Sequence, residues 1–449
     1  MKTTTILLSF ILFAVSATAQ NHNKYDLSDG RSYTPTVYTT GTIITDTTSS
    51  LKRIISNNNE ARINATADYH ETHRYGYDQV EKPQLIFTTK NNRFSLAVGG
   101  IAKLITSYDF KGISNAADFV PSSISVPGSY ADKQKLRMDA STSTLYLKAI
   151  ANTKALGRIV TYIDADFRGG EAAKDYRPRL KYAYISFLGL TIGRDATTFC
   201  DLSAAPATVD FAGPNAYSFN YATLIRYEHT FHQNHFRVGA ALEMPNLNAT
   251  YGENFKAIPQ RIPDVPFYFQ YMWDESRSSH IRGSAIFRDL HAYDSSNDSP
   301  TSLLGWGVQL SGNIKCTPWM RLIFNGVYGE GITPYIQDLV GSGLDFIPNP
   351  SNPKALQTVP MYGMQGSLQF NITDRLQMST GLSMVDVVES NGYESSYPYK
   401  HGVYGFGNIF YKITPRCTIA GEYLYGSRKN MDNVTGYANR FNLMFQYNF

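Results

Sequence analysis

The chain has 449 residues, of which 43% are hydrophobic and 17% charged, and it contains 32 Tyr and 25 Phe. The formal net charge of +4 is too small to indicate nucleic-acid binding, and no run of basic residues accompanies it. Three cysteines are too few for a disulfide framework, and their spacing excludes a zinc site of the C-x-x-C type. We expect Cys200, Cys316 and Cys417 to be packing residues, with a Cys316–Cys417 disulfide as the alternative.

Residues 1–19 have the pattern of a secretory signal peptide. A lysine precedes an apolar stretch, 6–15, and the small residues Ala17 and Ala19 follow it. This pattern predicts cleavage after Ala19. A short membrane anchor is the alternative, but the apolar stretch is too short to span a bilayer. The mature chain is therefore expected to leave the cytoplasm.

Residues 20–92 differ in composition from the rest of the chain. Residues 21–50 are polar and rich in Thr, with no hydrophobic periodicity, which is typical of a disordered segment. Residues 50–67 could form one amphipathic helix, although three successive Asn residues lower its helical propensity. We interpret 20–92 as a partly disordered periplasmic extension.

From residue 93 to residue 449 the chain repeats one pattern, in which turns separate segments of alternating apolar and polar residues. This pattern is typical of a transmembrane β-barrel. Sixteen segments are predicted: 93–110, 136–151, 157–168, 177–188, 189–199, 220–231, 235–246, 264–275, 280–294, 302–315, 319–332, 358–372, 374–390, 399–413, 416–429 and 436–449. No stretch after residue 20 is long and apolar enough to be a spanning helix. If the chain lies in a membrane, its strands must therefore close into a barrel.

The connections between these segments alternate between short and long. Those after the second, sixth, tenth and fourteenth segments are tight, whereas 111–135, 200–219, 247–263 and 333–357 are long and rich in Gly, Pro, Ser and Asp. Bacterial barrels have short periplasmic turns, long outer loops and an even strand number. The sequence therefore predicts an all-β, sixteen-stranded antiparallel barrel in the outer membrane of a Gram-negative bacterium. A soluble β-sandwich or propeller is the alternative, against which the Tyr-rich outer faces argue.

The last ten residues, RFNLMFQYNF, show the alternation most clearly. Phe441, Leu443, Phe445, Tyr447 and Phe449 share one face of a strand, and mainly polar residues share the other. We expect the apolar face to contact lipid, and the strand to close the barrel by pairing with the first strand. The terminal aromatic residue resembles the signal that the barrel assembly machinery of outer membranes reads.

Several stretches resemble the DcaP family of trimeric outer-membrane porins. The stretches that carry the resemblance are 94–109, 164–168, 179–184, 193–199, 208–214, 305–307, 328–332 and 421–426. They follow the family's order and approximate spacing, and the block 158–226 is the most specific of them. The resemblance implies a homotrimer of barrels that passes small solutes, with a preference for anions such as dicarboxylates. Arg194 and Ala196 depart from the family pattern, which has a polar amide and a Trp around the third loop.

Charged residues whose parity opposes the apolar face are candidates for lining the lumen. Among them are Arg168, Arg179, Lys181, Arg226, Arg237 and Arg321, and the departure from the family pattern adds Arg194. In this parity Leu180, Tyr182 and Tyr184 face lipid. Arginine outnumbers acid on the inward face, which predicts a positive lumen that enriches small anions. The alternative is that the cations pair across strands, as Arg226 could with Glu228, and only stiffen the wall.

The connection 200–219 is the best candidate for a constriction loop, which folds into the lumen and narrows it. It contains Asp201 and Asp210, and it is bracketed by Phe199 and Phe219. Acidic residues on the loop, opposite basic residues on the wall, would set a transverse field that selects solutes by charge. Packing of this segment at the trimer interface is the alternative.

No catalytic or metal-binding motif stands out. The HETH sequence at 70–73 lacks the i, i+4 histidine spacing of a zinc site, and no G-x-S-x-G elbow or P-loop occurs. The sequence thus favours a porin for passive diffusion of small hydrophilic solutes, without enzyme activity, metal or cofactor. Its expected partners are solutes, outer-membrane lipid, other copies of the chain and the assembly machinery. The alternatives are a barrel enzyme and an adhesive or structural barrel with a closed lumen.

Overall fold

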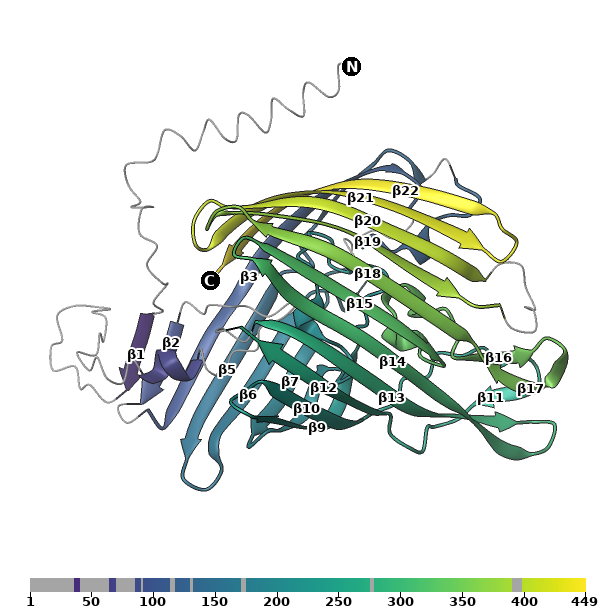
Figure 1. Ribbon diagram of the computed structural model, residues 1–449, viewed down its shortest axis with the longest axis horizontal. Helices are drawn as coiled ribbons and strands as arrows, with labels where there is room; N and C mark the ends of the chain where they lie inside the picture. Colours follow the sequence, from purple (N-terminus) through teal and green to yellow (C-terminus); the bar gives the residue numbers. More distant parts are fainter. Residues whose placement is uncertain are drawn as a thin grey trace, which may run out of the picture. The chain divides into compact units, whose positions relative to one another are not determined.

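The computed structural model describes residues 36–40, 64–69, 85–89, 92–113, 118–129, 132–170, 175–274, 278–389 and 398–449. The predicted signal peptide, 1–19, and most of the predicted extension lie outside these residues. The described chain is an all-β closed barrel of sixteen antiparallel strands (Figure 1), which confirms the predicted architecture. The barrel strands are β3 (Phe94–Lys111), β5 (Thr144–Thr153), β6 (Gly157–Asp166), β7 (Arg179–Phe187), β8 (Leu190–Ala196), β9 (Tyr221–Phe231), β10 (Phe236–Glu243), β12 (Val265–Trp273), β13 (Ser279–Asp294), β14 (Ser299–Thr317), β15 (Met320–Glu330), β18 (Pro360–Asn371), β19 (Leu376–Val387), β20 (Tyr399–Lys412), β21 (Cys417–Asn430) and β22 (Thr435–Asn448).

Shorter elements extend the barrel or pack inside it. β2 (Leu85–Thr89) pairs antiparallel with β3, and β1 (Thr36–Thr40) pairs parallel with β2. The remaining short elements are β4 (Lys135–Asp139) beside β3, β11 (Phe255–Ala257) beside β13, the hairpin of β16 (Phe346–Asn349) and β17 (Asn352–Thr358), and the 3-10 turns η1 (Pro121–Ser123), η3 (Leu202–Ala204), η4 (Thr333–Tyr335) and η5 (Gln337–Leu339). Residues 64–69 form a short helix of about one and a half turns. No helix among the described residues is long and apolar enough to cross a membrane.

The seam of the barrel lies where the last strand meets the first. β22 pairs antiparallel with β3, so that Asn448 lies opposite Ile101. Beyond β22, the backbone N–H of Phe449 donates to the carbonyl of Gly100 (3.0 Å), and the N–H of Gly100 donates to the carbonyl of Phe449 (2.9 Å). A Cβ atom on Gly100 would lie 2.8 Å from Cζ of the Phe449 ring. The seam therefore depends on the absence of a side chain at residue 100.

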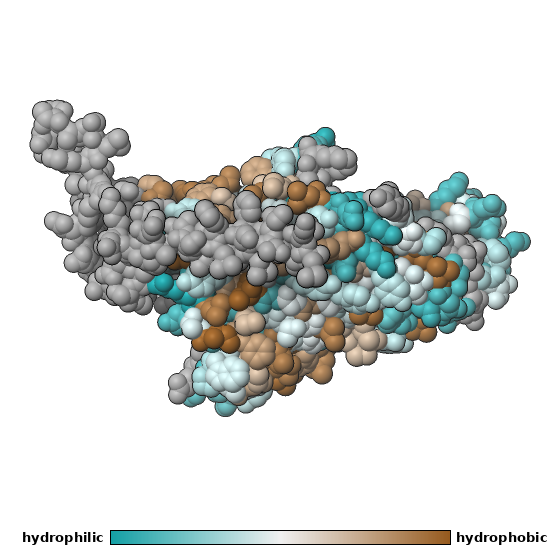
Figure 2. Space-filling view, turned by 90° about the horizontal axis from the view of Figure 1, so that it is seen from above, coloured by the Kyte–Doolittle hydropathy of each residue, from teal (hydrophilic) through white to brown (hydrophobic). Residues whose placement is uncertain are grey.

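The two faces of the barrel wall differ as the alternation predicts. Phe269, Leu443, Phe445 and Tyr447 are between 41% and 51% exposed on the outer face, whereas their neighbour Met444 is buried. Hydrophobic residues gather over part of the wall that is visible in Figure 2. Large apolar side chains exposed in this number on one continuous surface are unfavourable in water and favourable in lipid.

Aromatic rings cluster on the outer face where β9, β10 and β12 approach their tight turns. Phe236 lies with its ring centroid 5.5 Å from that of Phe231, 5.6 Å from Phe269 and 5.1 Å from Tyr271. Tyr271 in turn stacks on Trp273 at 5.7 Å. Such rings are typical of the boundary between hydrocarbon and water, where one end of the side chain is dry and the other wet.

The connections at the end where β3 begins and β22 finishes are all short, among them Leu188 and Gly189 between β7 and β8 and residues 232–235 between β9 and β10. We call this the tight-turn end of the barrel. The predicted alternation of short and long connections is not strict, because 295–298 between β13 and β14 and 431–434 between β21 and β22 are also short and lie at the opposite end. The longer connections, such as 197–220 and 331–345, leave the opposite end, and parts of both pack inside the barrel. Phe199, Tyr335 and Leu339 from these two connections share an apolar core with Met361 and Val385 of the wall.

The predicted parity is wrong in β7. The pairing of β6 with β7 shifts by one residue between Asp164 and Ala165, which leaves Lys181 as an extra residue of β7. A bulge of this kind reverses the alternation on its far side. Leu180 is 47% exposed on the outer face as expected, but Tyr182 and Tyr184 are buried inside the barrel rather than facing lipid.

The three cysteines do not form disulfides. Cys200 is buried and Cys417 is half-buried, whereas Cys316 is exposed, and all three are free. The alternative of a Cys316–Cys417 disulfide is therefore wrong, and Cys316 is not a packing residue.

Candidate functional site

The interior of the barrel holds the β8–β9 connection, residues 197–220. Its backbone carbonyls accept hydrogen bonds from inward-facing side chains of strands on the far side of the barrel. Asn313 Nδ2 donates to Ser203 (2.8 Å), Gln365 Nε2 to Ala204 (3.2 Å) and Asn408 Nδ2 to Ala207 (2.9 Å); these donors come from β14, β18 and β20. The segment thus crosses the interior from the strands that it connects to the opposite wall. We call it the inner segment.

Two wall carboxylates fix the inner segment at separate points. Glu243 of β10 accepts hydrogen bonds from the backbone N–H of Thr198 and from Oγ1 of Thr197, both at 2.6 Å. Glu422 of β21 accepts from the backbone N–H groups of Val209 (2.8 Å) and Asp210 (2.7 Å). Each carboxyl group accepts two hydrogen bonds from the inner segment, so these contacts hold the crossing in place.

The acidic residues of the inner segment are buried, each only 2% exposed. Asp201 accepts a hydrogen bond from Oγ of Ser311 (2.7 Å) and lies 2.9 Å from Nε2 of His280. Burial opposes its ionisation, but the His280 and Arg282 charges and these hydrogen bonds lower the pKa of Asp201 to about 2. Asp210 accepts from the backbone N–H of Phe119 at 3.0 Å. Both carboxylates therefore act as internal supports and face no open lumen.

The pKa of Asp210 shifts in the direction opposite to that of Asp201. Loss of water, and the nearby Asp118 and Glu422 carboxylates, raise the pKa of Asp210 well above its ordinary value. The flanking aromatic residues are also internal supports: Phe199 is fully buried with its ring 5.8 Å from that of Tyr335, and Phe219 packs against Tyr221 at 4.8 Å. The inner segment lies in the interior, but the expected field between exposed acids and bases does not arise from these residues.

Four of the predicted cations are paired with acids. Arg168 binds Asp118, and Arg179 binds Asp166 with Nε 3.0 Å from Oδ1. Lys181 Nζ lies 3.5 Å from Oδ1 of Asp164, with both side chains fully buried. The buried Arg226 contacts Asp195 as well as Glu228, whose Oε2 lies 3.1 Å from Nε. For these residues the structure matches the alternative of paired charges that stiffen the wall.

Arg194 lies on the other face of the wall. The register of β8 places it opposite Ala183 and Thr223, on the face of Ile192, which is 41% exposed to the outside. Its Nε donates to the carbonyl of Leu180 at 3.1 Å, beside the β7 bulge. The expectation that Arg194 faces the lumen is therefore wrong.

Arg237 and Arg321 do face inward, near the tight-turn end. Arg237 is exposed and lies in register with Gln270, a buried residue of the inner face. Arg321 is half-buried, with Nε 2.7 Å from Oδ1 of Asn313 and Nη2 2.9 Å from the carbonyl of Ser278. Neither forms an ion pair with an acid of the described chain.

Further cations, which the sequence analysis missed, lie on the inner face at the same end. Together with the two predicted residues they form what we call the cation ring: Lys103, Arg158, Arg237, Lys315, Arg321 and Lys412. Five of the six lie at or beside a tight turn, and Lys103 lies opposite Gln446, close to the end of the chain. All are exposed or half-exposed. The sequence contains a pattern that could have indicated these cations: a basic residue stands next to each of several tight turns.

Acids are nearly absent from the accessible part of the same surface. Among the inward positions of the described barrel strands, Glu228 is the only acidic residue that is not buried, and Nε of Arg226 lies 3.1 Å from it. A wall with accessible cations and buried or paired acids gives the enclosed water a positive potential. Within the described chain, no group of His, Cys, Asp and Glu could hold a metal ion.

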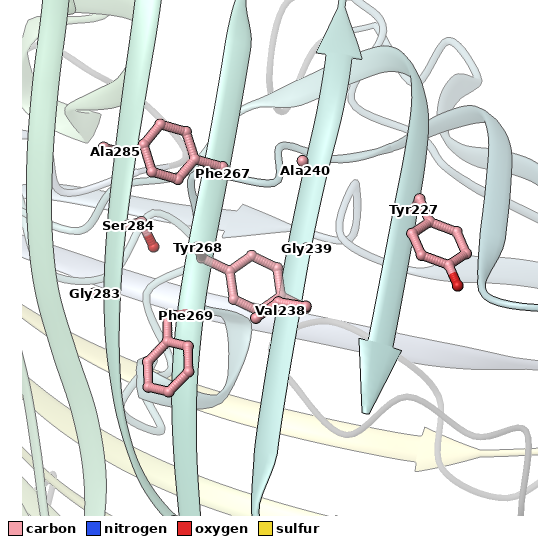
Figure 3. Close-up of a pocket in the computed structure, with 10 residues that line it drawn as sticks. All are labelled: Tyr227, Val238, Gly239, Ala240, Phe267, Tyr268, Phe269, Gly283, Ser284 and Ala285. Atoms are coloured by element: carbon pink, nitrogen blue, oxygen red, sulfur yellow. The ribbon is translucent and has the colours of Figure 1, made fainter. Parts of the chain in front are cut away.

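A groove of about 520 Å³ lies on the wall over β9, β10, β12 and β13 (Figure 3). Tyr227, Phe267 and Phe269 flank it, and Ala240 and Gly283 form part of its floor. These side chains belong to the outer, lipid-facing side of the strands, so the groove is separate from the interior.

Comparisons with known proteins agree with this architecture. Residues 51–449 match the model of the DcaP outer membrane protein family. The outer membrane channel DcaP of Acinetobacter baumannii is similar in structure, with a TM-score of 0.69 and 17% identity over 79% of this chain and 97% of that one. OmpT of Vibrio cholerae in its trimer form aligns with a TM-score of 0.51 and 9% identity (79% and 99% of the chains), and OmpF of Salmonella typhi with 0.51 and 10% (80% and 99%). No curated protein matches the sequence.

Proposed function

The chain belongs to the DcaP outer membrane protein family and is an outer-membrane porin, and from this premise we propose that its lumen favours small anions, dicarboxylates among them. We also propose that it works by passive diffusion, without enzyme activity, metal or cofactor. The observation that carries the anion preference is the cation ring, which faces a lumen with almost no accessible acid. Solutes on the way to the periplasm would pass the ring last, because tight turns lie at the periplasmic end of such barrels.

The proposed site residues differ in role. Arg237, Lys315 and Lys412 are exposed and act on the solute by long-range attraction, which a low-dielectric wall strengthens. Arg179, Lys181 and Arg226 hold neighbouring strands of the wall together through their acids. Arg168 holds Asp118 of the connection between β3 and β4. The inner segment narrows the passage by its bulk, because its backbone crosses to the far wall.

Selectivity in planar bilayers tests the proposal. The wild-type protein should give stepwise currents whose reversal potential in a salt gradient favours chloride over potassium. Arg237→Gln/Lys412→Gln should shift the reversal potential toward zero or toward the cation side, because two accessible charges are lost from the ring. Lys256→Gln/Lys354→Gln is the matched control, since both lysines are exposed on loop strands outside the barrel wall.

These recordings distinguish the proposed anion-selective porin from the alternative functions. An unchanged reversal potential in the Arg237→Gln/Lys412→Gln variant would refute the assignment of the cation ring. An absence of current steps in the wild type would favour a closed structural or adhesive barrel. The effect should also decrease at high salt, because mobile ions screen charges beyond a few ångströms.

We further infer that the chain works as a homotrimer that the barrel assembly machinery inserts through β22. OmpT of Vibrio cholerae, which has a similar fold, is known in a trimer form, and Phe449 completes the last strand at the seam. Light scattering of the protein in mild detergent should give the mass of three chains, and a monomer would contradict the assembly.

A further inference from the structure

The helical segment 64–69 lies against the inner wall at the tight-turn end. Asp68 is 7% exposed, Tyr69 is 3% exposed and Ala65 is fully buried. Ala65 and Tyr69 pack with Ile86 of β2 and Ala97 of β3. The inner face of β5, marked by Tyr146 and Lys148, contacts the same segment, so the segment lies inside the barrel mouth.

Among the described residues, three donors of the barrel wall and its rim hold the carboxylate of Asp68. Its Oδ1 accepts from Nη2 of Arg158 at 2.6 Å. Its Oδ2 accepts from Nδ2 of Asn92 (2.8 Å) and from Nδ2 of Asn152 (2.9 Å). A guanidinium with two amides, converging on one carboxylate from three separate elements, is a binding site for a carboxylate group.

Tyr69 completes the contact. The ammonium group of Lys148 lies 4.5 Å from the centre of the Tyr69 ring and donates to the Tyr69 carbonyl at 3.4 Å. The hydroxyl of Tyr69 lies 3.3 Å from that of Tyr146. The segment thus presents one carboxylate and one aromatic ring to two cations of the wall, as an anionic solute would.

We propose that segment 64–69 is a tethered ligand: Asp68 occupies a carboxylate subsite made of Arg158, Asn92 and Asn152, and the segment thereby narrows the periplasmic mouth. Arg158 belongs to the cation ring, so the subsite lies on the path that we propose for anions, and the inference rests on that proposed function. A free carboxylate that enters the mouth competes with Asp68 for the same donors. Its binding releases the segment and widens the passage.

Single-channel recording of the full-length protein tests this device. Asp68→Asn should raise the conductance, because the segment leaves the barrel mouth. It should also strengthen the anion preference, because the negative charge of Asp68 no longer offsets the positive charge of Arg158. Loss of one hydrogen bond to a charged group is enough to shift the equilibrium between the docked and the released segment about tenfold toward release. Glu253→Gln removes the same charge from an exposed position in an outer loop and should change neither quantity.

A second pair of variants distinguishes release from a change of charge. Arg158→Gln should also raise the conductance, but without a gain in anion preference, because the subsite cation is lost. Tyr69→Ala should raise the conductance with every donor of the subsite intact. Succinate added on the periplasmic side should increase the wild-type conductance to small ions and leave Asp68→Asn unaffected.

Correct folding of each variant is checked by the shift in gel mobility that heat causes in intact barrels. If Asp68→Asn and Tyr69→Ala both keep the wild-type conductance, segment 64–69 is no gate and the inference is overturned. The proposed function stands in that case as long as the wild type gives anion-selective steps. Loss of those steps in the wild type would instead remove the premise of both proposals.

Discussion

The ion pair of Asp109 and Arg440 gives a prediction for the stability of the seam. The two residues lie opposite each other on β3 and β22, with both side chains fully buried. Arg440 contacts the carboxylate with Nε 2.5 Å from Oδ1 and Nη2 3.1 Å from Oδ2. Arg137 adds a weaker contact, with Nε 3.7 Å from Oδ2 of Asp109.

Removal of one partner should therefore destabilise the barrel strongly. Breaking a buried pair costs about 3–5 kcal/mol, because a charge is left uncompensated in a dry site. For Arg440→Met we expect the lower end, ~3 kcal/mol, since Arg137 still compensates part of the Asp109 charge. Such a loss corresponds to roughly a 150-fold change in the folding equilibrium. Asp109→Leu/Arg440→Met should recover most of it, because no buried charge of the pair remains.

Urea titrations of the protein in lipid vesicles, read by heat-dependent gel mobility, give the four free energies of the double-mutant cycle. The expected result is a coupling free energy of roughly 5 kcal/mol or more between the two residues, because each single variant loses about 3–5 kcal/mol and the double variant loses little. The reasoning fails if Arg440→Met costs less than about 1 kcal/mol, the value of an exposed pair. It also fails if the double variant is as unstable as the worse single variant.

Two further predictions concern the seam and the inner segment. Gly100→Val should prevent closure of the barrel, because its side chain would collide with the Phe449 ring; the folded band should be lost on gels, whereas Gly366→Ala, where a Cβ meets nothing within 4 Å, should fold normally. Asp210→Asn should remove a pH dependence of stability. The raised pKa of Asp210 means that the folded state keeps a proton that the unfolded chain releases, so the wild type loses stability as pH rises from the ordinary Asp range through the raised value. Urea midpoints measured from acid to neutral pH should show this decline in the wild type and a flatter profile in Asp210→Asn, and equal slopes would contradict the assignment.

The sequence predicted the barrel because lipid imposes an alternation that can be read one residue at a time. The expectation that 200–219 folds into the lumen came from its place after the fifth segment, its two acids and the aromatic residues that flank it. The sequence did not predict the pairing of Arg179 and Lys181 with Asp166 and Asp164, because that depends on the register of β6 against β7. The hairpin of β6 and β7 contains all four charged residues. The extra residue at Lys181 shifts the pairing of the two strands, and a regular alternation does not predict that shift.

The cation ring was missed for a different reason. Parity assigns a side chain to a face but not to a level along the barrel axis, so residues from distant hairpins were not placed together. The level can be inferred from the tight turns, since Arg158, Lys315 and Arg321 each lie within a few residues of one. Arg194 was misplaced because its candidacy came from the family pattern, whereas its own alternation with Asp195 points it outward.

The clamps at Glu243 and Glu422 limit how the pore can be widened by protein engineering. Deletion of the inner segment alone would strip both carboxyl groups of their backbone donors and expose them to the water that replaces the segment, where they carry two negative charges on opposite walls. These would repel anions at the very place where space had been gained. A wider channel that still passes anions therefore requires neutral residues at 243 and 422 together with the deletion.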